Sequence, residues 1–309
     1  MTCGQPEAGL DDLRQHLRMV SVAEVLRRMG RPARSAELVA VTSRKALASA
    51  VRHGEVERLR RGIYALPGLA TDRMTAVAYD AVLSHLSAAR VWNLPLLVAP
   101  EKPHITVPVK RKPRRDPPAV LHWAEVTADE RRAGTTSPLR TVLDCARLLP
   151  FGEALAVADA ALAGGLIHPD ELLSAASALR GPGCPNARRV AVCADRRSGS
   201  FLESLLRALL FSNGVDGFEP QVLVNSEGFR ARVDLGHREA RVALEAEGYE
   251  FHGSANDFAA DCGRYDELVT AGWAVLRFTY QHVIGSPAWV VATTRAAVAQ
   301  RIGVPKDRR

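Results

Sequence analysis

Short amphipathic segments and helix-ending residues alternate in the first quarter of the chain. Apolar side chains recur at helical spacing in three segments, residues 21–29, 35–41 and 44–53. Gly30 and Gly54 follow the first and third segments, and Thr42 and Ser43 are good N-cap residues for the third. Residues 55–66 have the pattern of a short hairpin. We therefore expect three helices followed by two strands.

The middle of the chain is less regular. Helical periodicity predicts three helices, over residues 74–92, 139–149 and 153–162. Alternation of apolar and polar residues predicts a strand over residues 104–109, followed by a basic run at residues 110–115. Residues 179–185 are rich in Gly and Pro and are a candidate linker.

The last third shows a regular succession of elements. Helices are predicted over residues 199–211, 257–271 and 288–301, and strands over residues 218–224, 230–235, 241–247 and 274–278. The resulting order is αβββαβα. The whole pattern predicts an α/β multidomain chain with domains at residues 1–70, 71–197 and 198–309.

Positive charge is concentrated before residue 198. The formal net charge of the chain is +7. Residues 198–309 contain 12 Lys+Arg and 14 Asp+Glu, so their net charge is −2 and that of the remainder is +9. This distribution indicates that the first two domains approach a polyanion, although an arginine-rich composition alone would also give a basic surface.

Cysteine usage and hydropathy indicate the compartment. Five widely spaced cysteines without a CxxC pair are typical of free thiols in a reducing environment. No stretch approaches about 18 consecutive apolar residues, and residues 1–16 lack a basic start followed by an apolar run. We therefore expect a cytoplasmic, nucleoid-associated protein without membrane contact. The sequence does not indicate an oligomeric state.

The third predicted helix has the side chains that reading a DNA groove requires. Its apolar residues can face inward, which leaves four polar or basic residues outside: Arg44, Lys45, Ser49 and Arg52. The hairpin presents three arginines that suit phosphates: Arg58, Arg60 and Arg61. These residues predict contacts with double-stranded DNA. The alternative is a small helical bundle with a solvated basic face.

Two features of the middle domain have simpler structural explanations. Arg140 and Asp144 are four residues apart on a predicted helix, where an ion pair is the usual result, and His85 lies on a mixed face. We expect these three residues to be structural rather than catalytic. The basic run at residues 110–115 fits a phosphate-contacting loop and a solvated turn equally well.

Acidic residues of the last domain are spaced so that they converge. Glu245 and Glu247 share one face of a predicted strand because side chains two residues apart point the same way. Asp234 ends the preceding strand, and a short turn would bring it near Glu245. Glu203, on the helix before the strands, would complete the group. Taken singly, Glu203 would equally pair with Arg207, Asp234 would be a turn residue, and Glu247 would face solvent.

Carboxylates that meet at one end of a sheet suit a hard divalent cation. Mg²⁺, or Mn²⁺, prefers carboxylate, water and phosphate ligands, and its predicted ligands here are Asp234, Glu245 and Glu203. Such an ion activates water and stabilises charge on a scissile phosphate. Burying several like charges without it would be costly. The group therefore indicates metal-dependent phosphodiester hydrolysis.

Residues 35–68 resemble the winged-helix N-terminal domain of AbiEi-family antitoxins and related regulators. The likeness covers about residues 20–68, and its most specific part is RLRRGIYALPG. It extends into the middle domain through LSHLSAARVWNLPL, HITVPV and TSPLRTVLDCAR. The resemblance implies a winged helix-turn-helix in a DNA-binding autoregulator, often of a toxin–antitoxin operon, and a cognate toxin as a second partner.

The last domain is similar to PD-(D/E)xK nuclease domains of the very-short-patch-repair type. The likeness rests on FLESLLRALL, FEPQVLV, FRARVDLG, RVALEAEGYEFHG and DFAADCGRYDELVTAGWAVLRFTYQHV, in that order. It implies a restriction-endonuclease-like αβββαβα domain whose catalytic group is Glu203, Asp234, Glu245, Glu247 and His252. By the same resemblance Asp261 and Arg264 match a D-x-x-R motif, and Arg264 and Arg277 would hold phosphate oxygens.

Glu247 stands where the broad nuclease superfamily has lysine, so the group that assists the attacking water is left open. His252 is the candidate acid or base because histidine titrates near neutral pH. The sequence therefore predicts a DNA-binding protein with a Mg²⁺-dependent endonuclease domain. The alternative is a non-enzymatic transcriptional regulator, or AbiEi-type antitoxin, with an inactive nuclease fold.

Overall fold

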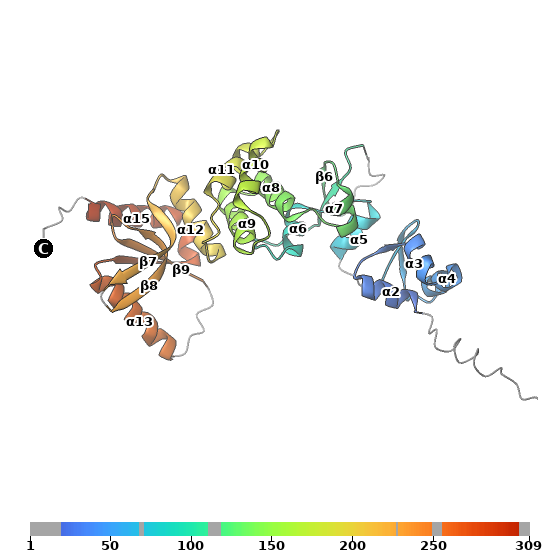
Figure 1. Cartoon of the computed structure of the whole chain (residues 1–309), viewed down its shortest axis with the longest axis horizontal. Coiled ribbons are helices and arrows are strands. Elements are labelled where there is room, and N and C mark those ends of the chain that lie inside the picture. The colour runs from blue at the N-terminus through green and yellow to red at the C-terminus, as the bar shows by residue number, and fades with distance from the viewer. Residues whose placement is uncertain (1–19, 68–70, 111–118, 227, 249–254, 303–309) are drawn as a thin grey trace, which may run out of the picture. The chain divides into compact units, whose positions relative to one another are not determined.

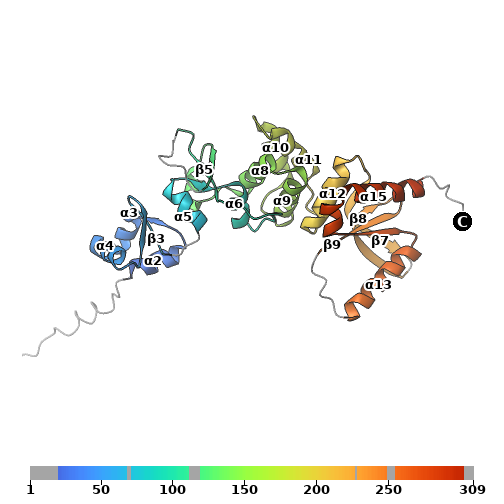
Figure 2. The ribbon, with the colours of Figure 1, turned by 180° about the vertical axis from the view of Figure 1, so that it is seen from behind.

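The contacts within the chain divide it into two units. A computed structural model describes residues 20–67, 71–110, 119–226, 228–248 and 255–302 (Figures 1 and 2). Unit 1 consists of Met1–Leu83 and Pro100–Thr136, and unit 2 of Ser84–Ala99 and Ser137–Arg309. This division differs from the three domains expected at residues 1–70, 71–197 and 198–309. Each unit is described by itself below.

Unit 1 begins with the three helices and the hairpin that the sequence predicts. The elements are α2 (Val22–Met29), β1 (Ala33–Arg34), α3 (Ser35–Val41), α4 (Arg44–Arg52), β2 (Glu57–Arg60) and β3 (Ile63–Ala65). The strands form a sheet in the order β1-β3-β2. Ser21 and Ser43 cap α2 and α4 with their hydroxyl oxygens, and Gly30 ends α2 in the left-handed conformation. Buried Leu26 and Leu38 lie in the core between the helices.

The rest of unit 1 is a second small sheet with two helices. Its elements are α5 (Thr71–Ala78), β4 (Val82–Leu83), β5 (His104–Val107), β6 (Val120–Trp123) and α7 (Ala128–Ala133). Strand β5 pairs antiparallel with β4 and parallel with β6. The predicted strand at residues 104–109 is therefore present, whereas β6 and α7 were not predicted. Residues 111–115 of the basic run lie outside the described residues.

The single helix predicted over residues 74–92 is wrong. Helix α5 ends at Ala78, and a separate helix, α6 (His85–Val91), belongs to unit 2. Asp80 has a left-handed φ of 55°, which ends the helical path, and Val82 then pairs with Thr106 of β5. The apolar period across this stretch thus comes from two helices and a short strand.

Five helices form the first part of unit 2. They are α6, α8 (Pro138–Leu148), α9 (Phe151–Ala163), α10 (Pro169–Ala178) and α11 (Cys184–Cys193), of which α10 and α11 were not predicted. Buried Val142, Leu172 and Val190 belong to one core between them. The predicted linker at residues 179–185 is wrong, because this stretch joins two helices of that core. Gly183 has a φ of 76°, and a Cβ there would lie 2.3 Å from the Arg147 carbonyl oxygen.

The second part of unit 2 has the predicted order of elements. It comprises α12 (Phe201–Ser212), β7 (Phe218–Ser226), β8 (Phe229–His237), β9 (Val242–Glu247), α13 (Ala255–Thr270), β10 (Ala274–Thr279), α14 (Tyr280–Gly285) and α15 (Pro287–Ile302). The sheet order is β10-β9-β8-β7, with only the β9–β10 pair parallel. The short helix α14 before α15 was not predicted. In the views of Figures 1 and 2, α13 and α15 flank the strands.

A buried ion pair joins the helices on the two sides of residue 198. Asp159 of α9 pairs with Arg207 of α12 and also accepts a hydrogen bond from the Ser204 hydroxyl at 2.7 Å. Arg207 donates to the Cys193 carbonyl oxygen at 2.7 Å. Removing one partner of such a pair leaves an uncompensated buried charge. The ion pair therefore links the five-helix part to the helix that precedes the sheet, in agreement with the assignment of both parts to unit 2.

Two stacked histidines give unit 1 a dependence on pH. The His104 Nδ1 and His122 Nε2 atoms are 3.0 Å apart on neighbouring strands. Burial, and then the charge of His104, lowers the pKa of His122 from 6.5 to about 4. Protonation therefore favours the unfolded chain, so stability is lost as the pH falls from 6.5 toward 4.

We predict that the wild-type chain loses stability relative to His122→Gln as the pH falls over this window. The expected loss is on the order of 1–3 kcal/mol, because each pKa unit corresponds to about 1.4 kcal/mol. Denaturant unfolding of both proteins at several pH values measures it. Parallel pH profiles of the two proteins would contradict the prediction.

Candidate nucleic-acid interface and carboxylate site

Helix α4 presents basic side chains on the face away from its buried residues. Leu47 and Ala50 are buried, whereas Arg44, Lys45 and Arg52 are exposed. These three cations form no ion pair with any residue that the structure describes. The fourth predicted residue on this face is half-buried Ser49, whose hydroxyl lies 3.3 Å from the His53 Nδ1. The face of α4 that is predicted to read the DNA groove is thus basic, and no described acidic residue neutralises its positive charge.

The hairpin holds two further exposed arginines beside α3. Arg58 on β2 and Arg61 in the turn are exposed, and the side chain of Arg60 lies outside the described residues. Gly62 takes the left-handed φ of 81° that closes the turn, and its carbonyl oxygen accepts a hydrogen bond from the Ser35 amide at 2.8 Å. This hairpin, which is the wing of the predicted winged helix, is therefore anchored to the start of α3.

Strand register brings the two central acids of unit 2 together. Leu235 of β8 pairs with Leu244 of β9, so Asp234 and Glu245 follow side by side at the end of this ladder. Asp234 Oδ2 accepts a hydrogen bond from the Ala246 amide at 2.9 Å. The predicted approach of Asp234 and Glu245 is therefore found in the structure.

Glu203 of α12 joins these acids through a glutamine that the sequence analysis missed. Gln221 of β7 donates from its Nε2 to Glu203 Oε2 at 2.8 Å and reaches Asp234 Oδ1 at 3.5 Å. Glu203 also accepts a hydrogen bond from the Gly199 amide at 2.8 Å, and it does not pair with Arg207. The backbone of Gln221 has a left-handed φ of 55°. No pattern in the sequence predicts that angle.

Burial makes the charged form of these acids unfavourable. The pKa of Glu245, a residue only 5% exposed, rises to about 7, first through burial and then through the nearby charge of Asp234. Burial, followed by the charge of Asp234, also raises the pKa of Glu203. The pKa of Asp234 is raised by burial, against the pull of its hydrogen bond from Ala246. Raised pKa values in a group of neighbouring acids are common at functional sites.

Two arginines, one from α13 and one from β10, contact Glu245 and Glu247. Arg264 donates from Nη1 to Glu245 Oε1 at 3.1 Å, and Arg277 donates from Nε to Glu247 Oε1 at 2.7 Å. The Tyr265 hydroxyl donates to the same Glu247 oxygen at 3.1 Å. Both guanidinium groups lie against the Tyr265 ring, at 4.7 and 4.4 Å from its centroid. The predicted phosphate-binding arginines thus lie beside the acids, and Arg277 and Tyr265 together hold Glu247.

No preformed metal shell is present among the residues that the structure describes. In that part of the chain, no group of three or more His, Cys, Asp or Glu side chains is arranged to hold a metal ion. The metal ligands that the sequence predicts, Asp234, Glu245 and Glu203, therefore stay a prediction. In the structure, Gln221 and Arg264 donate hydrogen bonds to oxygens of Glu203 and Glu245. His252 lies outside the described residues.

The remaining sequence expectations concern structural residues. Arg140 Nε lies 3.3 Å from Asp144 Oδ2 and forms the expected ion pair, and His85 Nδ1 lies 3.9 Å from the same oxygen. Asp261 lies 4.0 Å from Arg264 on α13.

Cys145, Cys184, Cys193 and Cys262 are free thiols. Over the described residues, every helix is too short or too polar to cross a bilayer.

Comparison with known proteins shows what the first module is similar to. Residues 10–67 match the family model described as transcriptional regulator, AbiEi antitoxin. Two curated relatives, the uncharacterized proteins MT2308 and Rv2248 of Mycobacterium tuberculosis, are each 30% identical over 159 residues. The match spans 51% of this chain and 59% of each relative. The N-terminal segment is therefore similar to AbiEi-type regulators.

A solved structure is also similar to part of the chain. The crystal structure of the RV2827C protein from Mycobacterium tuberculosis aligns with a TM-score of 0.34 and 14% identity. The alignment covers 67% of this chain and 87% of that one. At this level of similarity the alignment indicates neither a shared site nor a shared activity.

The pKa of Glu245 predicts a second dependence on pH, in unit 2. A raised pKa in the folded state favours the protonated acid, so its contribution is complete below 4.5 and is lost as the pH rises to about 7. Without divalent cations, the wild-type chain should lose on the order of 1–3 kcal/mol relative to Glu245→Gln over this window.

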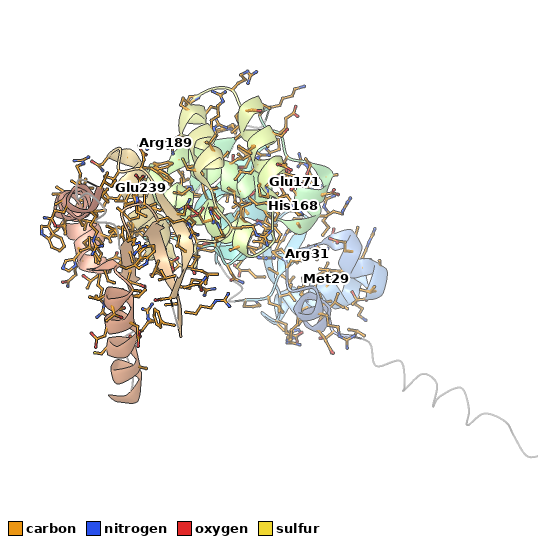
Figure 3. All side chains as sticks on the ribbon, turned by 60° about the vertical axis from the view of Figure 1, so that its left-hand side comes forward. Met29, Arg31, His168, Glu171, Arg189 and Glu239 are labelled. Carbon is orange, nitrogen blue, oxygen red and sulfur yellow. The ribbon has the colours of Figure 1, made fainter. Side chains whose placement is uncertain are left out.

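Denaturant unfolding of the two proteins in a chelating buffer measures the difference. Glu239→Gln is the matched control, because Glu239 is an exposed acid in the turn between β8 and β9 (Figure 3). A wild-type profile that runs parallel to that of Glu245→Gln would mean that Glu245 ionises normally.

Proposed function

We propose that the chain binds double-stranded DNA through its winged helix-turn-helix. The observation that carries this proposal is the set of uncompensated cations on the outer face of α4: Arg44, Lys45 and Arg52. A recognition helix of this kind lies in the major groove, while a basic wing contacts phosphates. The match of residues 10–67 to AbiEi-type transcriptional regulators supports the same assignment.

The wing supplies the contacts that fix the helix on the duplex. Arg58 and Arg61 project from the hairpin, and the bond between Ser35 and Gly62 holds this hairpin beside α3. We assign the same role to Arg60 from its place in the sequence, and to Ser49 a polar contact from α4. Phosphate contacts position a protein, and they come from basic residues of the wing and of the helix, while polar and basic residues of the helix also read base edges.

We further propose that unit 2 hydrolyses a phosphodiester bond in DNA. The observation that favours this activity is the close group of Glu203, Asp234 and Glu245, in which burial raises every pKa. A protein gains no stability from repelling buried acids, so their presence together supports a ligand that neutralises them. The resemblance to very-short-patch-repair endonucleases supports this reading.

The donor set fits a hard divalent cation, because it consists of carboxylate oxygens that repel one another. Asp234 and Glu245 would hold Mg²⁺ or Mn²⁺, with Glu203 in support. When bound, the ion lowers the pKa of water and stabilises charge on the phosphate. Glu245 must release Arg264 for this, which frees the guanidinium to bind a phosphate oxygen.

The other residues of the site have supporting roles in this proposal. Glu247 accepts hydrogen bonds from both Arg277 and Tyr265 and so orients these two side chains. Arg277 would then bind a phosphate oxygen. His252 moves a proton to or from the attacking water or the leaving oxygen, as its place after the strand motif in the sequence suggests.

A non-enzymatic regulator or AbiEi-type antitoxin is the second candidate function. The bond between Arg264 and Glu245 favours it, because it fills the acid group without a metal. In this case unit 2 would bind a partner such as a cognate toxin, and the winged helix would repress a promoter. A footprint on the chain's own promoter without divalent-dependent cleavage would support this candidate.

We predict that single substitutions of Arg44 and Lys45 weaken DNA binding and its salt dependence. Each phosphate contact contributes about 0.9 to the slope of log K against log salt, so Arg44→Ala and Lys45→Ala should each lower that slope by up to this amount. Fluorescence anisotropy with a labelled duplex at several salt concentrations measures it. Arg27→Ala, an exposed cation of α2, is the control, and an equal effect of this variant would refute the assignment.

We predict divalent-dependent cleavage of DNA that Asp234→Ala and Glu245→Ala reduce by about 100-fold or more, since each removes a charge that holds the cation. The assay uses matched, mismatched and nicked duplexes with Mg²⁺ or Mn²⁺. A chelator should abolish the activity, and Glu239→Ala should retain it. Absence of cleavage by the wild type, or equal cleavage by Asp234→Ala, would rule out the enzymatic proposal.

A further inference from the structure

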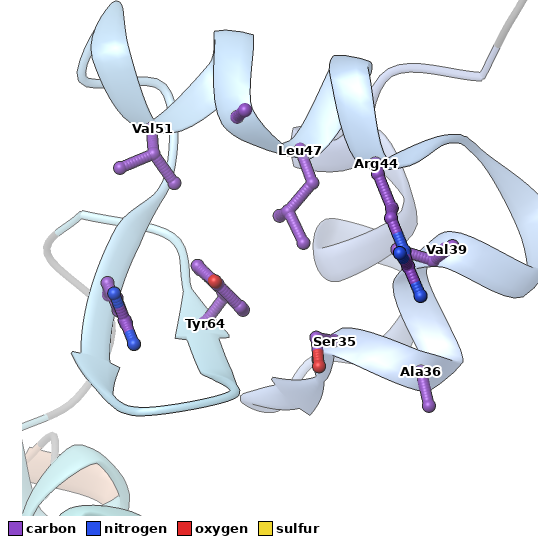
Figure 4. A pocket seen from close by; sticks show the side chains of 9 residues that line it. Ser35, Ala36, Val39, Arg44, Leu47, Val51 and Tyr64 are labelled. Atoms are coloured by element: carbon purple, nitrogen blue, oxygen red, sulfur yellow. The ribbon is translucent and has the colours of Figure 1, made fainter.

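The winged helix contains a cavity of about 650 Å³ that the DNA-binding proposal does not use. It lies between α3, α4 and the hairpin strands (Figure 4). Leu47 of α4 and Tyr64 of β3 point into it from opposite sides, and the Arg44 side chain lies along its edge. A cavity of this volume is in the range that small-molecule sites occupy.

The charges around the cavity select for an anion. Among the described residues, the charged side chains that line it are those of Arg44 from α4 and Arg58 from β2, and none is acidic. Neither arginine forms an ion pair with a described residue. Arginine stays protonated at all physiological pH values and binds carboxylates readily.

The other residues that line the cavity favour a ligand with an apolar body. Val39, Leu47 and Val51 line the cavity from two helices, and Val39, Val51 and Tyr64 are only partly buried. Apolar side chains gain free energy when a ligand removes them from water. The tyrosine hydroxyl adds one polar group that can donate a hydrogen bond.

We propose that this cavity binds a small amphipathic carboxylate. Its apolar body would pack against Val39, Leu47 and Val51, and its carboxylate would bind Arg44 and Arg58. Arg44 and Arg58 are also predicted DNA contacts, so the bound acid competes with DNA and releases the protein from it. Only this regulatory consequence rests on the proposed function, because binding of the acid needs no DNA.

Calorimetric titration of the full chain with 1-naphthylacetate and octanoate tests the site. At least one of these acids binds in a saturable, one-to-one manner, and its uncharged alcohol counterpart binds at least about tenfold more weakly. Arg44→Gln and Arg58→Gln each weaken binding of the acid about tenfold, whereas neither changes binding of the alcohol. Arg52→Gln is the matched control, since Arg52 lies on the same helix outside the cavity and leaves binding of the acid unchanged.

Three results would overturn the proposal: no saturable binding of either acid, equal affinity for acid and alcohol, or equal binding by wild type and both cavity variants. Circular dichroism verifies that each variant is folded. In a second measurement, the bound acid raises the apparent Kd for a labelled duplex in the wild type. If the wild type binds acid but no DNA, the DNA-binding proposal fails and the cavity assignment stands.

Discussion

The pairing of Leu235 with Leu244 is the constraint on which the site in unit 2 depends. It places Asp234 and Glu245 side by side at the end of a ladder, where both are largely removed from water. Burial, and then their mutual repulsion, raises the pKa of Glu245 to about 7 and makes the group receptive to cations. In the structure Arg264 supplies that positive charge. A shift of the register by one residue would send the two acids to different faces of the sheet.

The buried ion pair between Asp159 and Arg207 holds the third acid in place. Arg207 and Glu203 lie on the same helix, α12, so the pair fixes the helix that carries Glu203 against α9. Gln221 then connects Glu203 to Asp234. The acid group is therefore built from three elements, and its geometry depends on the packing of the five-helix part of unit 2 as well as on the sheet.

Local patterns predict much of this fold, whereas contacts between distant residues account for what they miss. Caps such as Ser43 and the alternation around Glu245 locate α4 and β9, and the same alternation brings Asp234 near Glu245. The period over residues 74–92 hides a strand that exists only because β5 pairs with it. Likewise, Tyr265 and Arg277 hold Glu247 from other elements, and no spacing along the chain encodes those contacts.

The central claim is that Asp234 and Glu245 together hold a hard divalent cation, and a metal-binding measurement tests it most directly. Electron paramagnetic resonance of Mn²⁺ titrated into the full chain counts bound ions without requiring a substrate. The account predicts one bound Mn²⁺ that Asp234→Asn and Glu245→Gln each lose and that Glu239→Gln retains. Absence of bound Mn²⁺ in the wild type, or equal binding by Asp234→Asn, would contradict it.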